Sequence, residues 1–187
     1  MPAASSPVAE PRALRSRPVC RLAAGPDERA RHFAIRRAVF CAEQGMFGGA
    51  DDRDARDDAA DTLHAVGAEG AVVGGTVRLY PLAPDGLWQG DRLAVLSAYR
   101  AHGVGGPLVR YAVATAAVLG GRTMSAHIQP GNVTFFRRLG WTDEGEPEIY
   151  AGLPHQPMSI ALPSYREGIA TIRRLEGDLI GPGPSPG

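Results

Sequence analysis

The chain has 187 residues, of which 44% are hydrophobic and 21% are charged, and these values predict one folded domain with a substantial core. Twenty basic residues balance twenty acidic ones, which argues against a nucleic-acid-binding protein that depends on bulk positive charge. All of the basic residues are Arg. The absence of Lys excludes both a lysine Schiff base and the lysine of a Walker-type nucleotide loop.

The sequence gives no sign of a disulfide framework, a metal site or a membrane span. Cys20 and Cys41 are the only cysteines, and we expect both to be small buried residues in a reducing cytosol. The five His are scattered without the paired spacing of metal ligands, so no metal site is predicted. No segment approaches the ~20 apolar residues of a membrane helix, and no signal-peptide stretch is present. We therefore expect a cytoplasmic protein.

Pro and small residues dominate both ends of the chain. We expect 1–15 and 181–187 to be disordered tails. The folded part is then a single domain over 16–162, followed by a C-terminal helix within 163–180.

In the first half of the chain, a short strand is predicted over 17–23. A helix follows from Gly25-Pro26, carries one apolar stripe through Ile35, Ala38, Val39 and Ala42, and ends near Gly45. The acidic segment 51–61 lacks the spacing of a calcium loop, so we expect a solvated loop. Further elements expected in this half are a hairpin of 64–68 with 71–80, a loop over 81–86 and a strand over 92–96.

In the second half, a Gly-rich loop over 99–106 leads into a helix. The other elements expected are that helix over 107–119, a strand over 123–128, a short helix over 132–139, strands near 141–142 and 157–162, and a last helix over 165–177. Ser164 and Glu167 form the capping-box pattern at the start of the last helix. The order of these elements predicts a mixed α/β fold around one sheet.

The segment from Arg100 to Gly106 carries the strongest functional signal. Its Gly-rich backbone between a strand and a helix can turn N–H groups inward, and the helix start adds partial positive charge, so the segment suits a pyrophosphate. Arg100 can add a charge-assisted contact. A dinucleotide fingerprint needs a third Gly where this chain has Leu108. A plain strand-to-helix loop is the structural alternative.

Two motifs give a family resemblance. Arg100-x-x-Gly103-x-Gly105 after a short apolar strand resembles the acyl-CoA signature of the GCN5-related N-acetyltransferases (GNAT), and the segment from Asn132 through Phe136 to Trp141 is similar to a second motif of that family. The resemblance spans about 30–162. A narrower resemblance is to a bacterial branch that is often encoded near a nitrilase. Its matches are Phe40 to Gln44, Asp52-x-Asp54, Gly75 to Arg78, Arg92 to Val95, Gln129, and Gly152 to His155 with Met158.

The resemblance implies a single mixed central sheet whose fourth and fifth strands splay apart, flanked by helices. It also implies transfer of an acetyl or other acyl group from acetyl-CoA, the co-substrate, to a primary amine. The residues that would bind CoA are Leu93, Ala94 and Val95 along the pantetheine arm, Arg100, His102, Gly103, Val104, Gly105 and Gly106 at the pyrophosphate, and Asn132. A backbone N–H near Val95 would polarise the thioester carbonyl.

The chain departs from the family at Phe136. The family has there a Tyr that protonates the CoA sulfur, and Phe cannot donate a proton; Phe136 would still border the CoA arm. Tyr150 and His127 are candidate substitutes for this acid. Glu43, near the end of the first helix, could hold or deprotonate the amine, and His127 is a second candidate base.

Three functions remain open on the sequence. The main expectation is an N-acetyltransferase that acts on a small-molecule amine, with no nucleic-acid or membrane partner. The first alternative is a CoA-binding sensor or assembly protein without transferase activity, which Phe136 keeps open. The second is an acetyltransferase that acts on a protein amine. A homodimer is a possible assembly.

Overall fold

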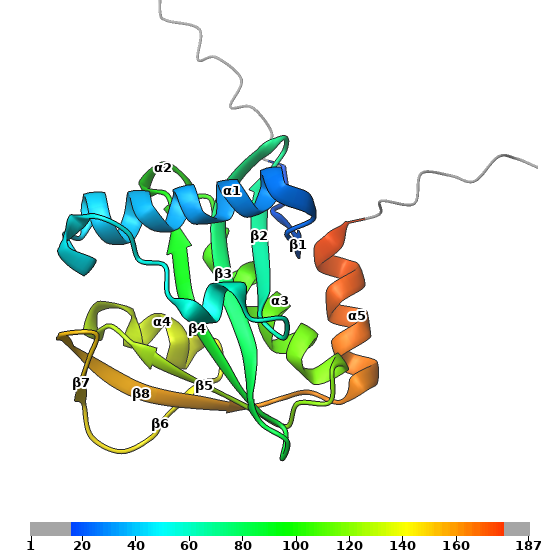
Figure 1. The fold of residues 1–187 in the computed structure, drawn as a ribbon. Helices are drawn as coiled ribbons and strands as arrows, with labels where there is room; N and C mark the ends of the chain where they lie inside the picture. Colours follow the sequence, from blue (N-terminus) through cyan, green and yellow to red (C-terminus); the bar gives the residue numbers. More distant parts are fainter. Residues whose placement is uncertain (1–15, 178–187) are drawn as a thin grey trace, which may run out of the picture.

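The computed structural model describes residues 16–177. The predicted tails at 1–15 and 181–187, and the last residues of the predicted C-terminal segment, lie outside the described residues. Figure 1 shows one twisted sheet with α1 on one face and α3 and α5 on the other. The sheet has eight strands in the order β1-β2-β3-β4-β5-β8-β6, with β7 paired to β8. Among the strands of residues 16–177, only β4 and β5 are parallel to each other; the other pairs are antiparallel.

Regular secondary structure takes up most of residues 16–177. The strands are β1 (Val19–Leu22), β2 (Leu63–Glu69), β3 (Val72–Ala83), β4 (Leu87–Val95), β5 (Thr123–Ile128), β6 (Thr142–Asp143), β7 (Glu148–Tyr150) and β8 (Leu153–Ala161). The α-helices are α1 (Gly25–Arg36), α2 (Ser97–Arg100), α3 (Gly105–Val118), α4 (Val133–Arg138) and α5 (Tyr165–Glu176). The π-helix η1 (Arg37–Glu43) extends α1, and η2 (Phe47–Gly49), η3 (Ala55–Asp58) and η4 (Pro130–Asn132) are short 3₁₀ turns.

Two hydrophobic clusters fill the space on either side of the sheet. Neighbouring residues of a strand point to opposite faces, and β2 follows this rule: Ala65 packs in the cluster with α3, whereas Val66 packs in the cluster with α1. Both residues are fully buried. The sheet is therefore covered on both faces, as the mixed α/β pattern predicts.

A pair of glycines lets α3 approach the sheet closely. Gly67 of β2 and Gly75 of β3 lie opposite each other in the ladder. A Cβ at either position would lie 2.9 Å from the side chain of Leu108, which is too close for a real contact. Leu108 of α3 therefore fills the space that the two glycines leave. In dinucleotide-binding folds, the third glycine of the motif lets the helix pack closely on the strands. In this chain, the two strand glycines Gly67 and Gly75 allow this close packing.

The first helix differs from its predicted form. It begins at Gly25 with Pro26 in its first turn, as expected, but after Arg36 it continues as a π-helix in which Gln44 N donates to Val39 O across five residues. This wider turn changes which side chains face the sheet. Ile35 and Val39 are buried as predicted, whereas Ala38 and Ala42 of the predicted stripe are exposed.

Three boundary predictions are also wrong. The loop expected over 81–86 is shorter, because β3 continues to Ala83, with a register irregularity between Pro81 and Ala83, and β4 starts at Leu87 rather than at 92. The segment 99–106 is not one loop, because its start belongs to α2 and its glycines 105 and 106 form the first turn of α3. The last sheet strand, β8, starts at Leu153 rather than 157, and its added residues pair with β7.

The C-terminal helix forms as its capping pattern predicts. Ser164 and Glu167 make both hydrogen bonds of the capping box. Gly168 lies against α3, where a Cβ would approach Val118 Cγ2 to 2.9 Å, and Leu175 is buried in the larger cluster. Helix α5 is thus packed directly on α3.

Candidate active site

A cleft opens where β4 and β5 separate. The two strands pair only over Leu87–Gln89 and Thr123–Ser125, and beyond these residues β4 runs towards α2 while β5 runs towards α4 (Figure 1). The cleft contains a cavity whose walls are mostly apolar with a few polar side chains. Its lining comes from η1 and the segment after it (Phe40, Gln44, Met46, Phe47), from β4 (Gly90, Asp91, Arg92, Leu93), from β5 and the residue after it (Met124, Ala126, His127, Ile128, Gln129), and from Val77, Val109, Ala112, Asn132, Phe136, Trp141, Tyr150, Ala151 and His155.

A bulge in β4 marks the start of the cleft. Thr76 pairs with Ala94 and Arg78 with Asp91, so two residues of β4, Arg92 and Leu93, lie opposite the single residue Val77. A bulge of this kind bends its strand and increases the local twist. Arg92 has a φ of 52°, in the left-handed region that non-glycine residues rarely adopt. The bend turns the end of β4 away from β5.

The backbone of β4 beyond Gln89 is bound to β3 on one side only. Ala94 and Val95 pair with Thr76 and Gly75 of β3, and within residues 16–177 no strand pairs with β4 on the other side of this segment. Leu93 lines the cavity, whereas the Ala94 side chain is buried on the α1 side of the sheet. The predicted pantetheine segment thus presents an unpaired strand edge to the cleft.

The first turn of α3 lies next to this edge and fits an anionic ligand. Its N-cap, Val104, makes no side-chain capping bond, and the N–H groups of a helix's first turn have no partner within the helix. A Cβ at Gly105 would lie 3.6 Å from Phe135 and 3.7 Å from Val95, so packing within the protein does not require glycine there. Gly103 has a φ of +74° with no atom within 4 Å of an added Cβ. These residues leave room for a ligand close to the backbone, as a pyrophosphate needs.

Arginine side chains border the same helix end. The Arg110 guanidinium reaches back along α3, with Nη1 3.5 Å from the position of a Cβ at Gly106. Arg100 lies on the other side, where Nε donates to Val95 O at 3.1 Å and Nη2 is 2.6 Å from Glu43 Oε1. Sequence reasoning missed Arg110, although its place one turn after Gly106 was a usable signal.

Two of the predicted residues are engaged outside the cavity. Glu43 forms its exposed ion pair with Arg100 and is absent from the cavity wall of the described chain. His102 contacts Glu69 through Nδ1 and packs edge-on to Tyr99. The structure therefore puts Glu43 at the rim of the cleft, between η1 and α2, and His102 on the side of β2.

Four polar side chains gather on one face of the strands β5, β8 and β7, and we call them the histidine–tyrosine cluster: His127, Glu148, Tyr150 and His155. His127 lies opposite Pro157 in the β5–β8 pair, and Glu148 lies opposite His155 in the β7–β8 pair. Because the pleat alternates, these positions share one face. The rings of His127 and Tyr150 stack at 4.1 Å with an interplanar angle of 2°. Three of the four, all but Glu148, line the cavity.

Hydrogen bonds indicate which nitrogen of each histidine would carry the proton in the neutral ring. His127 Nε2 lies 2.8 Å from Glu148 Oε1, and His155 Nδ1 lies 2.9 Å from Leu153 O. A carboxylate or a carbonyl can only accept, so these two nitrogens carry the protons. The bare nitrogens are then Nδ1 of His127 and Nε2 of His155. Nδ1 of His127 is buried and has no hydrogen-bond partner among the described residues, so it can accept a proton.

Of the predicted site residues, the cavity wall brings five together: Leu93, His127, Asn132, Phe136 and Tyr150. Phe136 packs edge-on to Trp141 with ring centroids 5.3 Å apart. Sequence reasoning gave Glu148 no role and named His155 only as a match of the narrower resemblance. The missing signal was β7, a three-residue strand too short to show a periodicity.

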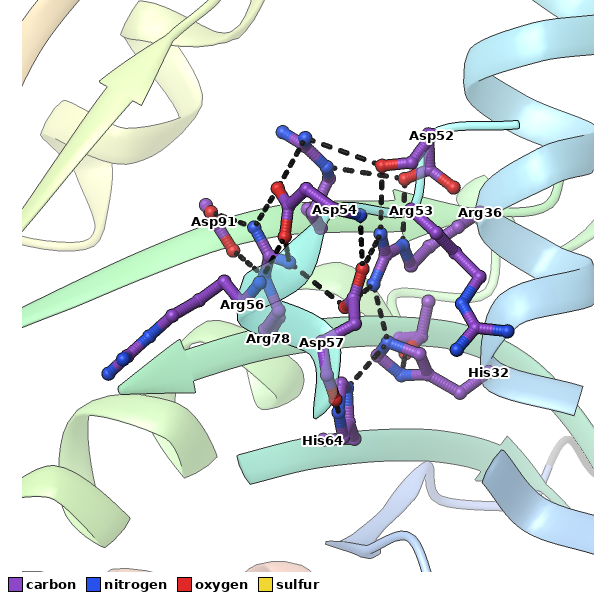
Figure 2. Close-up of polar contacts among 12 residues, drawn as sticks. His32, Arg36, Asp52, Arg53, Asp54, Arg56, Asp57, His64, Arg78 and Asp91 are labelled. Atoms are coloured by element: carbon purple, nitrogen blue, oxygen red, sulfur yellow. Dashed lines mark hydrogen bonds and ion pairs between the residues drawn. The ribbon is translucent and has the colours of Figure 1, made fainter. Parts of the chain in front are cut away.

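The acidic segment 51–61 is solvated only in part: Asp51, Asp54, Asp58 and Asp61 are exposed, as its composition predicts, but two aspartates are not. Asp52 and Asp57 are each 1% exposed. Figure 2 shows them joined to buried arginines in an arginine–aspartate network, which consists of Arg36, Arg78, Arg92, Asp52, Asp54, Asp57 and Asp91. Arg36 and Arg78 are as deeply buried as the aspartates. A loop rich in Asp folds inward because two arginines of other elements lie behind it.

Hydrogen bonding in the network is close to complete for Arg36 and Arg78. Arg36 donates to Asp52 Oδ2 at 2.7 Å and to both oxygens of Asp57 at 2.5 and 3.0 Å. Burial alone would raise the pKa of Asp57, but the hydrogen bonds from Arg36 and from the backbone of Asp54 outweigh it and hold that pKa well below its usual range. Asp57 is therefore ionised in the folded protein and stabilises the charged arginines.

A pair of buried histidines continues the network towards β3. His32 of α1 contacts the Thr76 hydroxyl and lies 3.1 Å from His64 Nδ1. Burial, with His64 and Arg36 nearby, lowers the pKa of His32 to about 2, and burial also lowers the pKa of His64. Both are neutral at pH 7. The network and these histidines fix α1 and η1, which form one wall of the cleft, to the central strands.

No helix within residues 16–177 is long and apolar enough to cross a membrane. The same residues contain no group of three or more His, Cys, Asp or Glu that could hold a metal ion.

Comparison with known proteins supports the family resemblance. Residues 60–143, a little under half of the chain, match the family model of the acetyltransferase (GNAT) domain. A search of curated protein sequences finds no match. Among solved structures, a Lactobacillus plantarum protein described as an N-acetyltransferase is 26% identical, with a TM-score of 0.66 over 78% of this chain and 98% of its own.

Two further structures share the fold. FeeM, an N-acyl amino acid synthase from uncultured soil microbes, is 19% identical with a TM-score of 0.67, over 81% of this chain and 94% of its own. An aminoglycoside 6'-N-acetyltransferase complexed with coenzyme A is 16% identical with a TM-score of 0.60, over 73% of this chain and 92% of its own. The predicted mixed sheet with separated middle strands is thus confirmed as a GNAT-like fold.

Proposed function

We propose that the protein is a GNAT N-acyltransferase that moves an acetyl or other acyl group from acyl-CoA to the primary amine of a small molecule. The observation that carries the proposal is the meeting of the unpaired edge of β4 with the uncapped first turn of α3. The edge can hydrogen-bond an extended amide-containing arm, and the helix start suits a pyrophosphate. CoA carries an amide-containing pantetheine arm joined directly to a pyrophosphate. The domain match and the CoA-bound neighbour support the same assignment.

CoA would supply the acyl group as an activated thioester. Gly103, Gly105 and Gly106 would approach the pyrophosphate with their backbone, and Arg100 and Arg110 would add positive charge. Leu93 to Val95 would line the pantetheine arm, bordered by Asn132 and Phe136. The N–H group near Val95 would stabilise the negative charge that develops on the thioester carbonyl oxygen. His102 would be a further contact of this loop, and it would have to keep or exchange its contact with Glu69.

The reaction requires a group that removes a proton from the incoming ammonium. The amine nitrogen then bonds to the acyl carbon, the carbon–sulfur bond breaks, and the thiolate takes up one proton, while a second proton is released to solvent. His127 is the proposed base, since its bare Nδ1 is unpartnered and Glu148 holds the proton on Nε2. This arrangement follows the logic of a histidine oriented by a carboxylate. Tyr150, stacked on His127, is the proposed acid for the thiolate.

Glu43 stays a second candidate for the amine. Its carboxylate is paired with Arg100 at the rim, so it would have to change partners before it could hold an ammonium. For this reason we rank Glu43 below His127 as the candidate base. The narrower resemblance to the nitrilase-associated branch stays a prediction.

One observation favours a second function. Phe136 lines the cavity at the position where the family places an acid, and a phenyl ring cannot donate a proton. A protein that binds CoA without transfer, as a sensor or assembly partner, would tolerate this substitution. A thiolate is a good leaving group because a thiol has a pKa of about 8.5, so the enzyme needs the missing acid less than an amide-cleaving enzyme would. An acceptor on a protein is the third candidate.

The decisive experiment measures cofactor binding and transfer separately. Acetyl-CoA should raise the melting temperature of the protein in proportion to the logarithm of its concentration, because it binds the folded state. Release of free thiol should then be followed with a panel of amines and with amine-bearing peptides. Thiol release with a small amine supports the enzyme. A thermal shift without thiol release from any acceptor favours the CoA-binding alternative, and no shift at millimolar acetyl-CoA contradicts both.

A further inference from the structure

Arg92 is the one cationic side chain in the wall of the cavity, as far as residues 16–177 form it. It lies on the bulge of β4, next to Leu93 of the proposed pantetheine segment and three residues before Val95. Arg92 lies opposite Val77, two residues along β3 from Gly75, the partner of Val95, so Arg92 is about 7 Å along the sheet from Val95 at a rise of about 3.4 Å per residue, away from the first turn of α3. This is the acceptor side of the cleft under the proposed function.

The guanidinium of Arg92 is less completely hydrogen-bonded than those of its neighbours. Its contacts are an ion pair from Nε to Asp52 Oδ2 at 3.2 Å, and bonds from Nη2 to Asp54 Oδ2 at 3.2 Å and to Asp52 O at 3.4 Å. Nε is buried and its approach to Asp52 does not form a hydrogen bond, and Nη1 forms no hydrogen bond or ion pair within residues 16–177. Arg78, by contrast, makes bidentate pairs with Asp54 and Asp91 at 2.6–3.0 Å.

The neighbouring aspartates compensate the positive charge of the buried Arg92 side chain, but they do not accept hydrogen bonds from all of its N–H groups. Its side chain is 11% exposed, against 0% for Asp52 and 42% for Asp54. A buried polar group without a partner is uncommon in folded proteins and marks a site that a ligand or water completes. The left-handed backbone at Arg92 is a second independent departure from regular structure, and such strain concentrates at functional sites.

An apolar wall stands beside this guanidinium. Arg92 lies over the ring of Phe47, 4.8 Å from its centre, and Phe47 packs edge-on to Phe40 with centroids 6.4 Å apart. Both rings line the cavity. A ligand that reaches Arg92 with an oxyanion would therefore place an adjoining apolar group against Phe40 and Phe47.

We infer that the acceptor is an amine that carries a carboxylate, with Arg92 as the residue that selects it. The inference rests on the proposed function, because it assigns one end of the acceptor whose amine attacks the thioester. The acceptor class is an amino acid with an apolar side chain: its carboxylate accepts from Nη1 of Arg92, and its side chain meets the phenylalanine wall. A planar guanidinium suits a carboxylate because it can donate two parallel hydrogen bonds.

The test compares amines that differ only in the carboxylate. Thiol release from acetyl-CoA is measured with L-phenylalanine and with phenethylamine, its decarboxylated counterpart. We expect the wild-type kcat/KM to favour phenylalanine by about 10- to 100-fold, the value of a hydrogen bond to a charged group. Arg92→Gln should bring this ratio towards one, and Arg92→Lys should keep part of it. Arg137→Gln, which removes an exposed arginine paired with Asp143, should leave the ratio unchanged.

Binding of the products separates this inference from the proposed function. Calorimetric titration with N-acetyl-L-phenylalanine and N-acetylphenethylamine needs no turnover, and circular dichroism checks that each variant is folded. Equal kcat/KM values for the two amines, or a higher value for phenethylamine, overturn the carboxylate assignment. A carboxylate preference that survives Arg92→Gln overturns the role of Arg92. Selective binding of the carboxylate product without thiol release from any amine supports the anionic site and contradicts the transferase.

Discussion

Nε and Nη2 of Arg78 donate to the two carboxylate oxygens of Asp91 at 2.8 and 2.7 Å, and the same guanidinium binds both oxygens of Asp54. Arg78 on β3 thus joins β4 to the turn before η3, behind the wall of the cleft. Asp91 itself lines the cavity. The geometry of the acceptor side therefore depends on ion pairs that lie beneath it, so the stability of the network and the activity of the site are linked.

The first prediction concerns the buried aspartate at the centre of this network. Asp57→Asn should lower the free energy of unfolding by as much as about 3 kcal/mol, because it removes the buried counter-charge that Arg36 and Arg78 share and leaves Arg36 with Asp52 and Arg78 with Asp54 and Asp91. Asp58→Asn is the matched control: its side chain is 69% exposed and pairs with Arg53 at 3.3 Å, so its loss should cost less than about 1 kcal/mol. Urea denaturation at pH 7.5 measures both. Equal losses would show that the network adds nothing beyond a surface pair.

The second prediction concerns pH. His32 and His64 have lowered pKa values in the folded protein, so the unfolded chain binds more protons once the pH falls below about 6.5. Their contribution to stability is complete above that pH and is lost as the pH falls towards the folded values. Asp57 behaves in the same direction at lower pH, because its pKa lies below the unfolded value of about 3.9. Unfolding free energy should thus decline from pH 7 to 5 and more steeply below 5.

A variant separates the two ranges. His64→Gln should make the decline between pH 7 and 5 shallower, because only His32 then contributes to it, and should leave the steeper fall below pH 5 in place. Urea midpoints at pH 7.5, 6, 5 and 4 give the comparison. A wild-type stability that is constant from pH 7 to 5 would contradict the assignment of neutral buried histidines.

Local patterns predicted the elements of this fold because the signals lie within a few residues of each other. Pro26 marks the start of α1, the Ser164–Glu167 pair marks the start of α5, and Gly103 to Gly106 mark the start of α3. The separation of β4 and β5 came from the family resemblance, since no local signal distinguishes a strand that pairs over three residues from one that pairs over nine.

The arginine–aspartate network could not be predicted because its partners are distant in sequence. Asp57 meets Arg36 and Arg78, which are 21 residues before and 21 residues after it. Composition alone favours a solvated loop for 51–61, since unpaired charges avoid the interior. One signal was available: His32 and Arg36 share the helix face of Ile35 and Val39, and a charged residue on a buried face needs a buried partner.

The third prediction tests the proposed CoA loop. Gly105→Val should remove the thermal shift by acetyl-CoA while the fold survives, because the added Cβ meets only ordinary contacts within the protein but enters the space left for the pyrophosphate. Ala170→Val, an equally β-branched change at an exposed position of α5, is the control and should keep the shift. Differential scanning fluorimetry with and without acetyl-CoA measures both. An unchanged thermal shift in Gly105→Val would show that the pyrophosphate does not bind at the first turn of α3.

The fourth prediction assigns the base. His127→Gln should lower kcat by roughly 10² to 10⁴ at saturating amine, because it removes the only bare nitrogen that Glu148 orients, and the pH–rate profile should lose the limb that reports this imidazole. Glu148→Gln keeps an acceptor for Nε2 but removes its charge, so its loss should be smaller. Glu146→Gln, an exposed change before β7, is the control for that hairpin.

The rival assignment, in which Glu43 is the base, makes the opposite prediction. If Glu43 is the base, the large loss falls on Glu43→Gln and His127→Gln keeps its pH dependence, whereas a Glu43 that only anchors the amine raises the acceptor KM with kcat unchanged.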